Sequence, residues 1–269
     1  MGAPPPAIVA FGARDRSRAL LKKAFPRRRS TLTLTTTPAA TLEALQGRYT
    51  DAVIVDVGAP GAMSVAVSEL SREFPSIPFF ALAPLRATEL PQLAQACARG
   101  EFADLLVEGM EDLVVRDLIA PHAVTARFAR AMAPAAAAIG LSTPLQQQVW
   151  ALIVGQGGRA VGTEALATAV GLTREHLSRR FSAGGAPNLK RVIDLARLLA
   201  AAEFAKNPGF DLPDVARVLG FASPTHLSTT CERLLGVRGA SLARLRAEDV
   251  MRRFVGEGAR SRGQVTGTR

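Results

Sequence analysis

The chain has 269 residues, 48% of them hydrophobic, and a formal net charge of +10. That length is sufficient for two domains with cores of their own. The two cysteines, Cys97 and Cys231, are too few and too far apart for a disulfide scaffold or a metal site, and they suit a reducing compartment. No signal peptide is recognisable, and prolines interrupt the uncharged run of residues 131–158, so we expect a cytoplasmic protein without a membrane span.

Residues 1–120 alternate short apolar or β-branched runs with helical patterns. Five runs of strand length that are separated by helices predict a parallel sheet covered on both faces, which is a (βα)5 doubly wound α/β domain. The strand runs are residues 7–11, 31–36, 52–57, 78–82 and 103–107, and the helical patterns are residues 17–25, 39–48, 62–74, 87–98 and 111–119.

Asp56 lies at the end of the third strand run, and Pro60 follows it. The segment from Asp51 to Gly61 resembles the phosphoacceptor strand of response-regulator receiver domains. The resemblance places Asp56 at the phosphorylated position, where Mg²⁺ and cationic groups neutralise the charge of the transferred phosphoryl group. An apolar strand that ends in Asp is also common in α/β folds, so a structural carboxylate at the strand end is the competing interpretation.

The neighbouring positions depart from the receiver pattern. Phe11 and Gly12 stand where receivers carry the acidic Mg²⁺ ligands, and Ala83 replaces the switching hydroxyl. Glu108 replaces the lysine after the fifth strand, and its charge would repel a phosphate on Asp56. We therefore expect a pseudo-receiver in which Asp56 is not phosphorylated. Phosphorylation-dependent regulation through Asp56 is the alternative.

The crevice at the carboxyl ends of the strands is where ligands of open α/β sheets bind. No Gly-rich phosphate loop follows the first strand, and we interpret Gly58 as a turn residue. Dimerisation, a protein partner and a small-molecule effector remain as candidate inputs, and we expect no cofactor and no metal. The expected lining of the crevice is Gly12, Asp56, Gly58, Pro84 and Glu108.

Residues 121–140 separate the two halves of the chain. The run from Ala131 to Gly140, which has four alanines after Pro134, predicts a linker, although alanine-rich runs also form helices. Residues 144–154 then predict a helix in which Trp150 packs in the core. At the other end, residues 249–269 carry several Gly and Arg residues, and we expect a disordered basic tail.

Two segments about fifty positions apart repeat one pattern. In each, a short helix ends on a glycine, Gly171 or Gly220, and an apolar residue follows. A hydroxyl residue, Thr173 or Ser223, then caps a second helix whose polar side chains point outward. This arrangement predicts two helix-turn-helix units, the motif that places a recognition helix in the major groove of DNA.

The segment from Pro187 to Asn207 predicts one long helix between the two units. Its polar side is expected to carry the opposite-charge pairs of Lys190, Asp194 and Arg197. A rigid connection of suitable length lets one chain read two successive major grooves, which lie about 34 Å apart.

Residues 166–244 resemble the DNA-binding domain of the AraC/XylS transcription regulators. The resemblance is most specific from Asp214 to Gly236, and it implies a double helix-turn-helix domain over residues 141–248. Gly239 stands where the family usually carries proline, which weakens the expectation for base reading by the second unit. Arg179 is the strongest base-reading candidate, because a guanidinium can bond O6 and N7 of guanine together. The residues that we expect at DNA are Thr173, Arg174, Glu175, Ser178, Arg179, Arg180, Thr225, His226, Ser228 and Thr229.

Charge agrees with a nucleic-acid partner. Residues 1–130 hold 15 Lys and Arg against 13 Asp and Glu, a net charge of +2, whereas residues 131–269 hold 18 against 10, a net charge of +8. We therefore predict a sequence-specific transcription regulator that binds double-stranded DNA and dimerises through its N-terminal domain. No nucleophile and base pair or acid-base pair supports the alternative of an enzyme built on the α/β domain.

Overall fold

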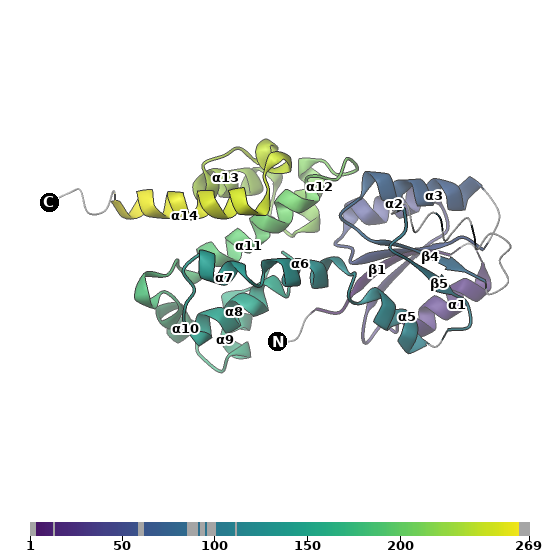
Figure 1. Cartoon of the computed structure of the whole chain (residues 1–269), viewed down its shortest axis with the longest axis horizontal. Coiled ribbons are helices and arrows are strands. Elements are labelled where there is room, and N and C mark those ends of the chain that lie inside the picture. Colours follow the sequence, from purple (N-terminus) through teal and green to yellow (C-terminus); the bar gives the residue numbers. More distant parts are fainter. Residues whose placement is uncertain are drawn as a thin grey trace. The chain divides into compact units, whose positions relative to one another are not determined.

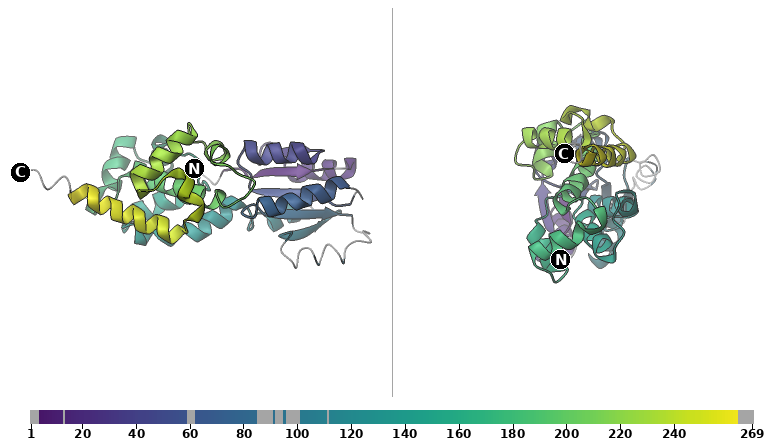
Figure 2. Two further views of the ribbon diagram at one scale, coloured as in Figure 1. Left: turned by 90° about the horizontal axis from the view of Figure 1, so that it is seen from above. Right: turned by 90° about the vertical axis from the view of Figure 1, so that its left-hand side faces the viewer.

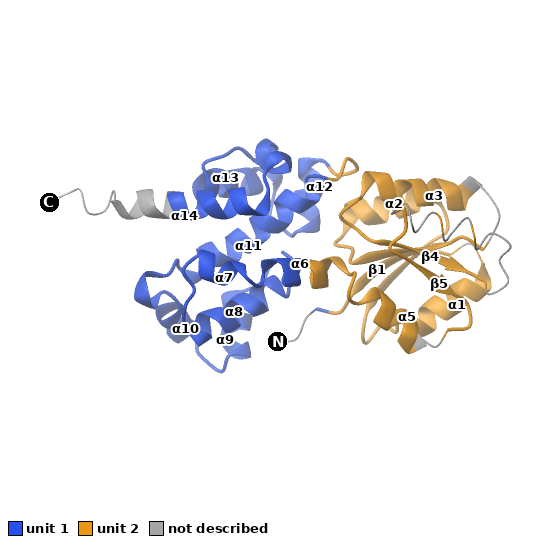
Figure 3. Ribbon diagram, in the orientation of Figure 1, with its two compact units in different colours: residues 1–4, 128–206, 211–269 blue, residues 5–127, 207–210 orange. Residues whose placement is uncertain are grey.

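The computed structural model describes residues 4–12, 14–58, 62–84, 91, 95, 101–110 and 112–263. The chain divides into two compact units, which Figure 3 shows in orange and blue. An α/β unit holds residues 5–127 together with residues 207–210, and a helical unit holds residues 1–4, 128–206 and 211–269. The chain therefore passes from one unit to the other after Pro4, after Arg127 and at both ends of the segment Asn207–Phe210.

The α/β unit contains a five-stranded sheet in the order β2-β1-β3-β4-β5, in which every neighbouring pair is parallel. Helices α1 and α5 pack together on one face and α2 and α3 on the other, as Figure 1 shows. The expected doubly wound α/β class is confirmed. The strands are β1 (Ala7–Phe11), β2 (Thr31–Thr35), β3 (Ala52–Asp56), β4 (Phe79–Ala83) and β5 (Asp104–Val107), and the helices are α1 (Asp15–Ala24), α2 (Pro38–Gly47), α3 (Ala62–Glu73) and α5 (Asp112–Ile119).

Burial of the strands explains why the sequence pattern predicts them. Strands β3 and β4 are buried at every position, as expected for a parallel sheet with helices on both faces. Each expected strand begins and ends within one residue of its position in the structure. Of the expected helix over residues 87–98, only residues 91 and 95 lie within the described part of the chain, and Cys97 lies outside it.

The helical unit places Trp150 at its centre, and the indole Nε1 donates to the carbonyl oxygen of Met132 over 2.9 Å, so its expected packing role is confirmed. Cys231 is a buried free thiol, and burial raises its pKa to about 12. The helices are α6 (Val124–Met132), which begins in the α/β unit, α7 (Ala135–Ala138), α8 (Pro144–Val154), α9 (Thr163–Ala169), α10 (Arg174–Phe181), α11 (Leu189–Phe204), α12 (Leu212–Val218), α13 (Pro224–Leu235) and α14 (Ala247–Gly263), with 3₁₀ turns η1 (Ala183–Gly185) and η2 (Gly239–Arg244).

Two expected irregular segments are helical. Within residues 121–140, α6 and α7 form because their apolar side chains are buried, among them Phe128, Met132 and Ile139. The expectation of disorder from residue 249 onward is wrong as far as Gly263. Figure 2 shows α14, in yellow, as a continuous helix, and Val250 and Phe254, one turn apart, are buried in the helical unit.

No helix in the described part of the chain combines the length and the apolar character that a membrane span requires.

Candidate nucleic-acid interface and the Asp56 cluster

The turn of the first helix-turn-helix unit forms as the sequence predicts. Gly171 adopts a left-handed φ of 69°, which only glycine takes without strain, and this ends α9. The hydroxyl of Thr173 then accepts a hydrogen bond from the backbone N–H of His176 and caps α10. Leu177 and Phe181 on the inner face of α10 are fully buried, so the other side of this helix faces outward.

The outward side of α10 carries the candidate base-reading residues. Ser178 is half-buried on the same helix, and the side-chain amide of Gln146 on α8 donates to the carbonyl oxygen of Phe181 over 2.7 Å, which fixes the end of the helix. The exposed members of the predicted set on this unit are Thr173, Arg174, Glu175, Arg179 and Arg180.

The second helix-turn-helix unit repeats this geometry. Gly220 has a φ of 67°, and the Ser223 hydroxyl accepts from the N–H of His226 over 3.0 Å to cap α13. Thr225, His226 and Thr229 are exposed. The hydroxyl of Thr229 bonds to the carbonyl oxygens of Thr225 and His226, so its proton is engaged within the helix.

Ser228 of the second unit is half-buried against Gly239. A Cβ at position 239 would lie 2.5 Å from the hydroxyl oxygen of Ser228 and 3.3 Å from its Cα, so glycine lets η2 approach α13 closely without displacing Ser228. The departure from the family's proline therefore has a packing reason. Ser228 is also less exposed than Thr225, His226 and Thr229 on the same helix.

The prediction of ion pairs along α11, the helix between the two helix-turn-helix units, is wrong. Asp194 and Arg197 are buried, because this side of α11 packs against the second unit. The Arg197 guanidinium donates to the carbonyl oxygens of Leu219 and Gly220, and it lies 3.8 Å above the centroid of the Phe221 ring. Burial lowers the pKa of Arg197, and the charge of Asp194 partly offsets this effect.

The partner of Asp194 is Arg233 on α13. A guanidinium nitrogen of Arg233 lies 2.8 Å from Asp194 Oδ2. Together with Arg197, this contact fixes the turn and the recognition helix of the second unit to α11. A regular spacing of charges along one helix is equally compatible with pairs on that helix and with pairs to a neighbour, and only the fold decides between them.

The second candidate site surrounds Asp56 at the end of β3. Its carboxylate is fully buried and receives hydrogen bonds from three different residues. Arg14 contributes both its guanidinium and its backbone N–H, Ser17 contributes its hydroxyl at 2.5 Å, and Gly58 contributes its N–H at 3.1 Å. These donors occupy the roughly four lone-pair positions of a carboxylate.

Arg14 also explains how two acidic groups coexist here. Its Nη2 atom lies 2.5 Å from Asp56 Oδ1 and 2.5 Å from Glu108 Oε1, so one guanidinium nitrogen bridges both carboxylates. Arg16 approaches Glu108 from the exposed side at 3.4 Å. Arg14 is not among the residues that the sequence predicts at this site. Its only sequence signal is a basic residue shortly after the first strand, where receivers carry acidic Mg²⁺ ligands.

Electrostatics keep both members of this contact ionised. Burial by itself would raise the pKa of Asp56, but the hydrogen bonds from Arg14 and Ser17, with the positive charge of Arg14, lower it below its usual value. Burial by itself would lower the pKa of Arg14, and its contacts with Asp56 and Glu108 outweigh that effect and raise it.

Gly58 leaves the room that the guanidinium needs. A Cβ at this position would lie 2.4 Å from Arg14 Nη2 and 2.4 Å from the ring of Pro84. Gly58 lies in a bend after β3 and has no positive φ, so close approach to Arg14 and Pro84, rather than a left-handed backbone conformation, is what requires glycine here. Gly12, Asp56, Gly58, Pro84 and Glu108 all lie at the carboxyl edge of the sheet, as expected.

The residues around Asp56 do not fit a resident Mg²⁺ ion. A guanidinium occupies the carboxylate oxygens that a cation would need, and the described residues contain no cluster of three His, Cys, Asp or Glu side chains suited to a metal.

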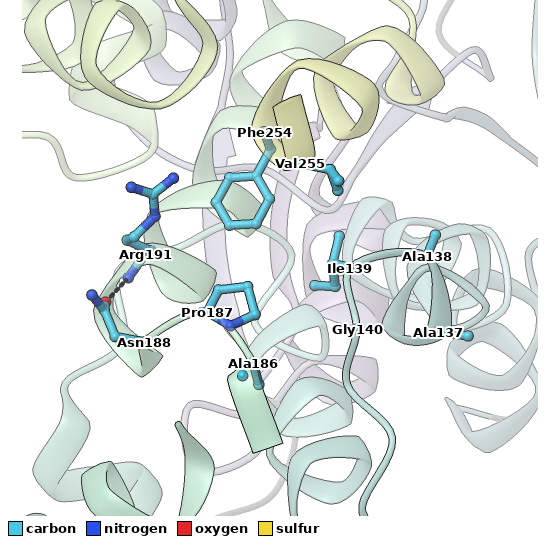
Figure 4. A pocket seen from close by; sticks show the side chains of 11 residues that line it. Ala137, Ala138, Ile139, Gly140, Ala186, Pro187, Asn188, Arg191, Phe254 and Val255 are labelled. Atoms are coloured by element: carbon cyan, nitrogen blue, oxygen red, sulfur yellow. Dashed lines mark hydrogen bonds between the residues drawn. The ribbon is translucent and has the colours of Figure 1, made fainter. Parts of the chain in front are cut away.

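The helical unit contains a cavity of about 580 Å³ between α14, the residues after α7 and the start of α11. Figure 4 shows Phe254, Ile139 and Pro187 around it, with Arg191 at one side. The Arg191 guanidinium lies 5.3 Å from the centroid of the Phe254 ring. This volume falls in the range of small-molecule sites, and the lining is mostly apolar.

Comparison with known proteins assigns the helical region. Residues 166–244 match the family model described as Helix-turn-helix domain. A search of curated proteins finds no match.

Several solved structures are similar to parts of the chain. Full-length FixJ from B. japonicum shares 19% identity over 79% of this chain and 94% of its own, with a TM-score of 0.39. The response regulator StyR shares 15% identity over 71% of this chain and 97% of its own, with a TM-score of 0.38. The signal receiver domain of an HD domain-containing protein from Pseudomonas fluorescens Pf-5 shares 18% identity over 44% of this chain and 94% of its own, also with a TM-score of 0.38. Residues 166–244 thus form a helix-turn-helix domain, and the α/β unit contains a five-stranded parallel sheet.

Proposed function

We propose that this protein is a sequence-specific transcription regulator that reads double-stranded DNA mainly with α10 and uses its α/β unit as a phosphorylation-independent input. The observation that carries the proposal is the pair of capped, outward-facing recognition helices within a domain of the helix-turn-helix family. A genome-wide map of bound sites in the source organism tests it. Enrichment of one sequence motif upstream of genes supports the proposal, and binding without sequence preference contradicts it.

The two recognition helices are expected to contribute unequally. We predict that Arg174→Ala with Arg179→Ala lowers affinity for a selected DNA site at least tenfold more than Thr225→Ala with Thr229→Ala, on the order of 1.4 kcal/mol. The reason is that α10 presents exposed guanidinium groups, whereas Thr229 already donates its proton within α13. Fluorescence anisotropy at one fixed salt concentration measures both. Equal losses would show that both helices read bases.

The hydrogen bonds that already occupy the Asp56 carboxylate argue against the alternative of regulation through phosphorylated Asp56. Phosphoryl transfer needs an oxygen of Asp56 as the nucleophile and a metal ion beside it, and Arg14, Ser17 and Gly58 already bond these oxygens.

We predict that acetyl phosphate with Mg²⁺ leaves DNA affinity within about twofold of the untreated value, a change that corresponds to roughly 0.4 kcal/mol. Intact-protein mass spectrometry should find no added phosphoryl group. The control is Asp56→Asn, which keeps the size of the side chain and removes its nucleophilic charge. A phosphoryl adduct on the wild type that is absent from Asp56→Asn, together with altered DNA affinity, would overturn the prediction.

Two kinds of input signal to the regulator have support, a second copy of the chain and a small-molecule ligand. Helix α5 leaves Leu113 57% and Val114 39% exposed, which supports a homodimer through the α/β unit. The cavity beside Arg191 offers room for a small-molecule effector. The enzyme alternative has little support, because the lining of the cavity beside Arg191 contains no nucleophile and base pair. A DNA regulator of this kind would act in the cytoplasm.

A further inference from the structure

The segment Asn207–Phe210, here called the connector, joins α11 to α12 along the chain but belongs to the α/β unit. Figure 3 shows it in orange between the blue helices that precede and follow it. The first helix-turn-helix unit, α9 and α10, contains no comparable excursion, because residues 128–206 all belong to the helical unit. Of the two helix-turn-helix units, only the second therefore begins directly after a segment that belongs to the α/β unit.

Polar contacts bind the connector to the end of α3 and to the loop that follows it. The side chain of Asn207 is buried, accepts from the N–H of Ser76 at 2.9 Å and donates to the Ser76 hydroxyl at 2.7 Å. The N–H of Gly209 donates to the carbonyl oxygen of Glu73 at 3.0 Å. The amide of Gln46 on α2 donates to the carbonyl oxygen of Gly209 at 3.0 Å. Side chains and backbone of the connector are thus both engaged.

An aromatic contact completes the attachment. Phe210 is 8% exposed, and its ring meets the fully buried ring of Phe74 edge to face, with 4.9 Å between the centroids. Gly209 lies so close to the same ring that a Cβ at this position would be 2.5 Å from its Cζ atom. Because Gly209 has no positive φ, the ring of Phe74 is what excludes a side chain there.

Helix α12 begins immediately after these contacts. Asp211, the residue after Phe210, caps α12 by accepting from the N–H of Asp214 at 2.7 Å, and Asp214 returns a bond to the N–H of Asp211. No flexible residue therefore separates the attached connector from the first helix of the second unit.

We propose that the connector couples the α/β unit to the second helix-turn-helix unit, so that the packing of Phe74 and Ser76 against the connector determines how firmly α12 is held. A change of structure at the end of α3 then reaches α12 directly, through covalent chain, without passing through α9 or α10. This inference extends the proposed function, but it is testable without DNA.

A substitution that creates a steric clash, and a second one that relieves it, test the proposal in the full-length chain. Gly209→Ala adds one methyl group whose three nearest atoms belong to the Phe74 ring, and Phe74→Leu removes these ring atoms. We expect Gly209→Ala to speed hydrogen exchange of the α12 amides about tenfold, and the double variant to return within about twofold of the wild type. Gly47→Ala is the matched control, since a Cβ there meets nothing within 4 Å.

A second pair of variants keeps the test independent of any folding defect in the first. Ser76→Ala removes the hydroxyl partner of Asn207 from the α/β side and leaves the helical unit unchanged in sequence. Faster exchange in α12 but not in α10 supports the coupling. The proposal is overturned when α12 exchange stays at the wild-type rate in both Gly209→Ala and Ser76→Ala, or when α10 responds as much as α12.

Discussion

Replacing Arg14 by alanine is expected to lower the free energy of unfolding of the α/β unit by about 3 to 5 kcal/mol, because two buried carboxylates then lose their shared cation. Asp56 is fully buried and Glu108 nearly so, and neither can turn to solvent without unpacking the sheet edge. Native-state hydrogen exchange of the β1 and β3 amides measures this unit separately from the helical one.

The pH dependence of that loss has a defined sign. The lowered pKa of Asp56 stabilises the folded wild type above the unfolded pKa of the group, and this contribution disappears as the pH falls through the folded value. Without Arg14, burial dominates and raises the pKa of Asp56, so protonation of Asp56 stabilises the folded Arg14→Ala variant. The difference in the free energy of unfolding between the wild type and Arg14→Ala should therefore decrease as the pH is lowered from 7 toward about 4.

Arg16→Ala serves as the control for Arg14, because its side chain is 79% exposed and contacts Glu108 only at 3.4 Å. We expect a change of at most about 0.5 kcal/mol for this variant. If Arg14→Ala also lies within about 1 kcal/mol of the wild type, the bridging role of Arg14 is incorrect.

Arg179→Ala should weaken binding to a selected DNA site by about 1 to 3 kcal/mol, since a guanidinium on α10 is suited to bond a guanine at two positions. Arg179 is exposed near the end of α10, whose inner face is fixed by Leu177 and Phe181. Affinity for random duplex DNA should change little. Both affinities are measured by fluorescence anisotropy at the same ionic strength.

Arg72→Ala is the control for the lost charge, because Arg72 lies on α3 of the α/β unit and its side chain is 72% exposed. It should leave both affinities unchanged within error. Equal losses for Arg179→Ala on selected and random DNA would make Arg179 a phosphate contact instead of a base-reading residue.

Local signals made the helix-turn-helix units predictable. The left-handed glycines, the hydroxyl caps at Thr173 and Ser223, and the buried residues Phe181 and Cys231 all depend on residues close together in the sequence. The strands were predictable for a similar reason, because a parallel sheet covered on both faces leaves nearly continuous apolar runs.

Contacts between distant segments were not predictable in the same way. Arg14 and Asp56 are 42 positions apart, and the sequence shows two acidic groups at the sheet edge without the cation that joins them. Asp194 has its partner 39 positions away on α13, although Lys190 and Arg197 lie nearer in the sequence. The connector is a stronger case, since Asn207 and Ser76 are 131 positions apart. Specific side-chain geometry after folding decides each of these contacts.

Selection of binding sites from a random duplex DNA library tests the central claim most directly. The full-length wild type should enrich one motif with a strongly specified segment read by α10 and, about 10 base pairs away, a weakly specified segment at α13. Arg174→Ala with Arg179→Ala should lose the segment read by α10 while the protein remains folded. Failure of the wild type to enrich any sequence, or an unchanged motif in the double variant, would contradict the account.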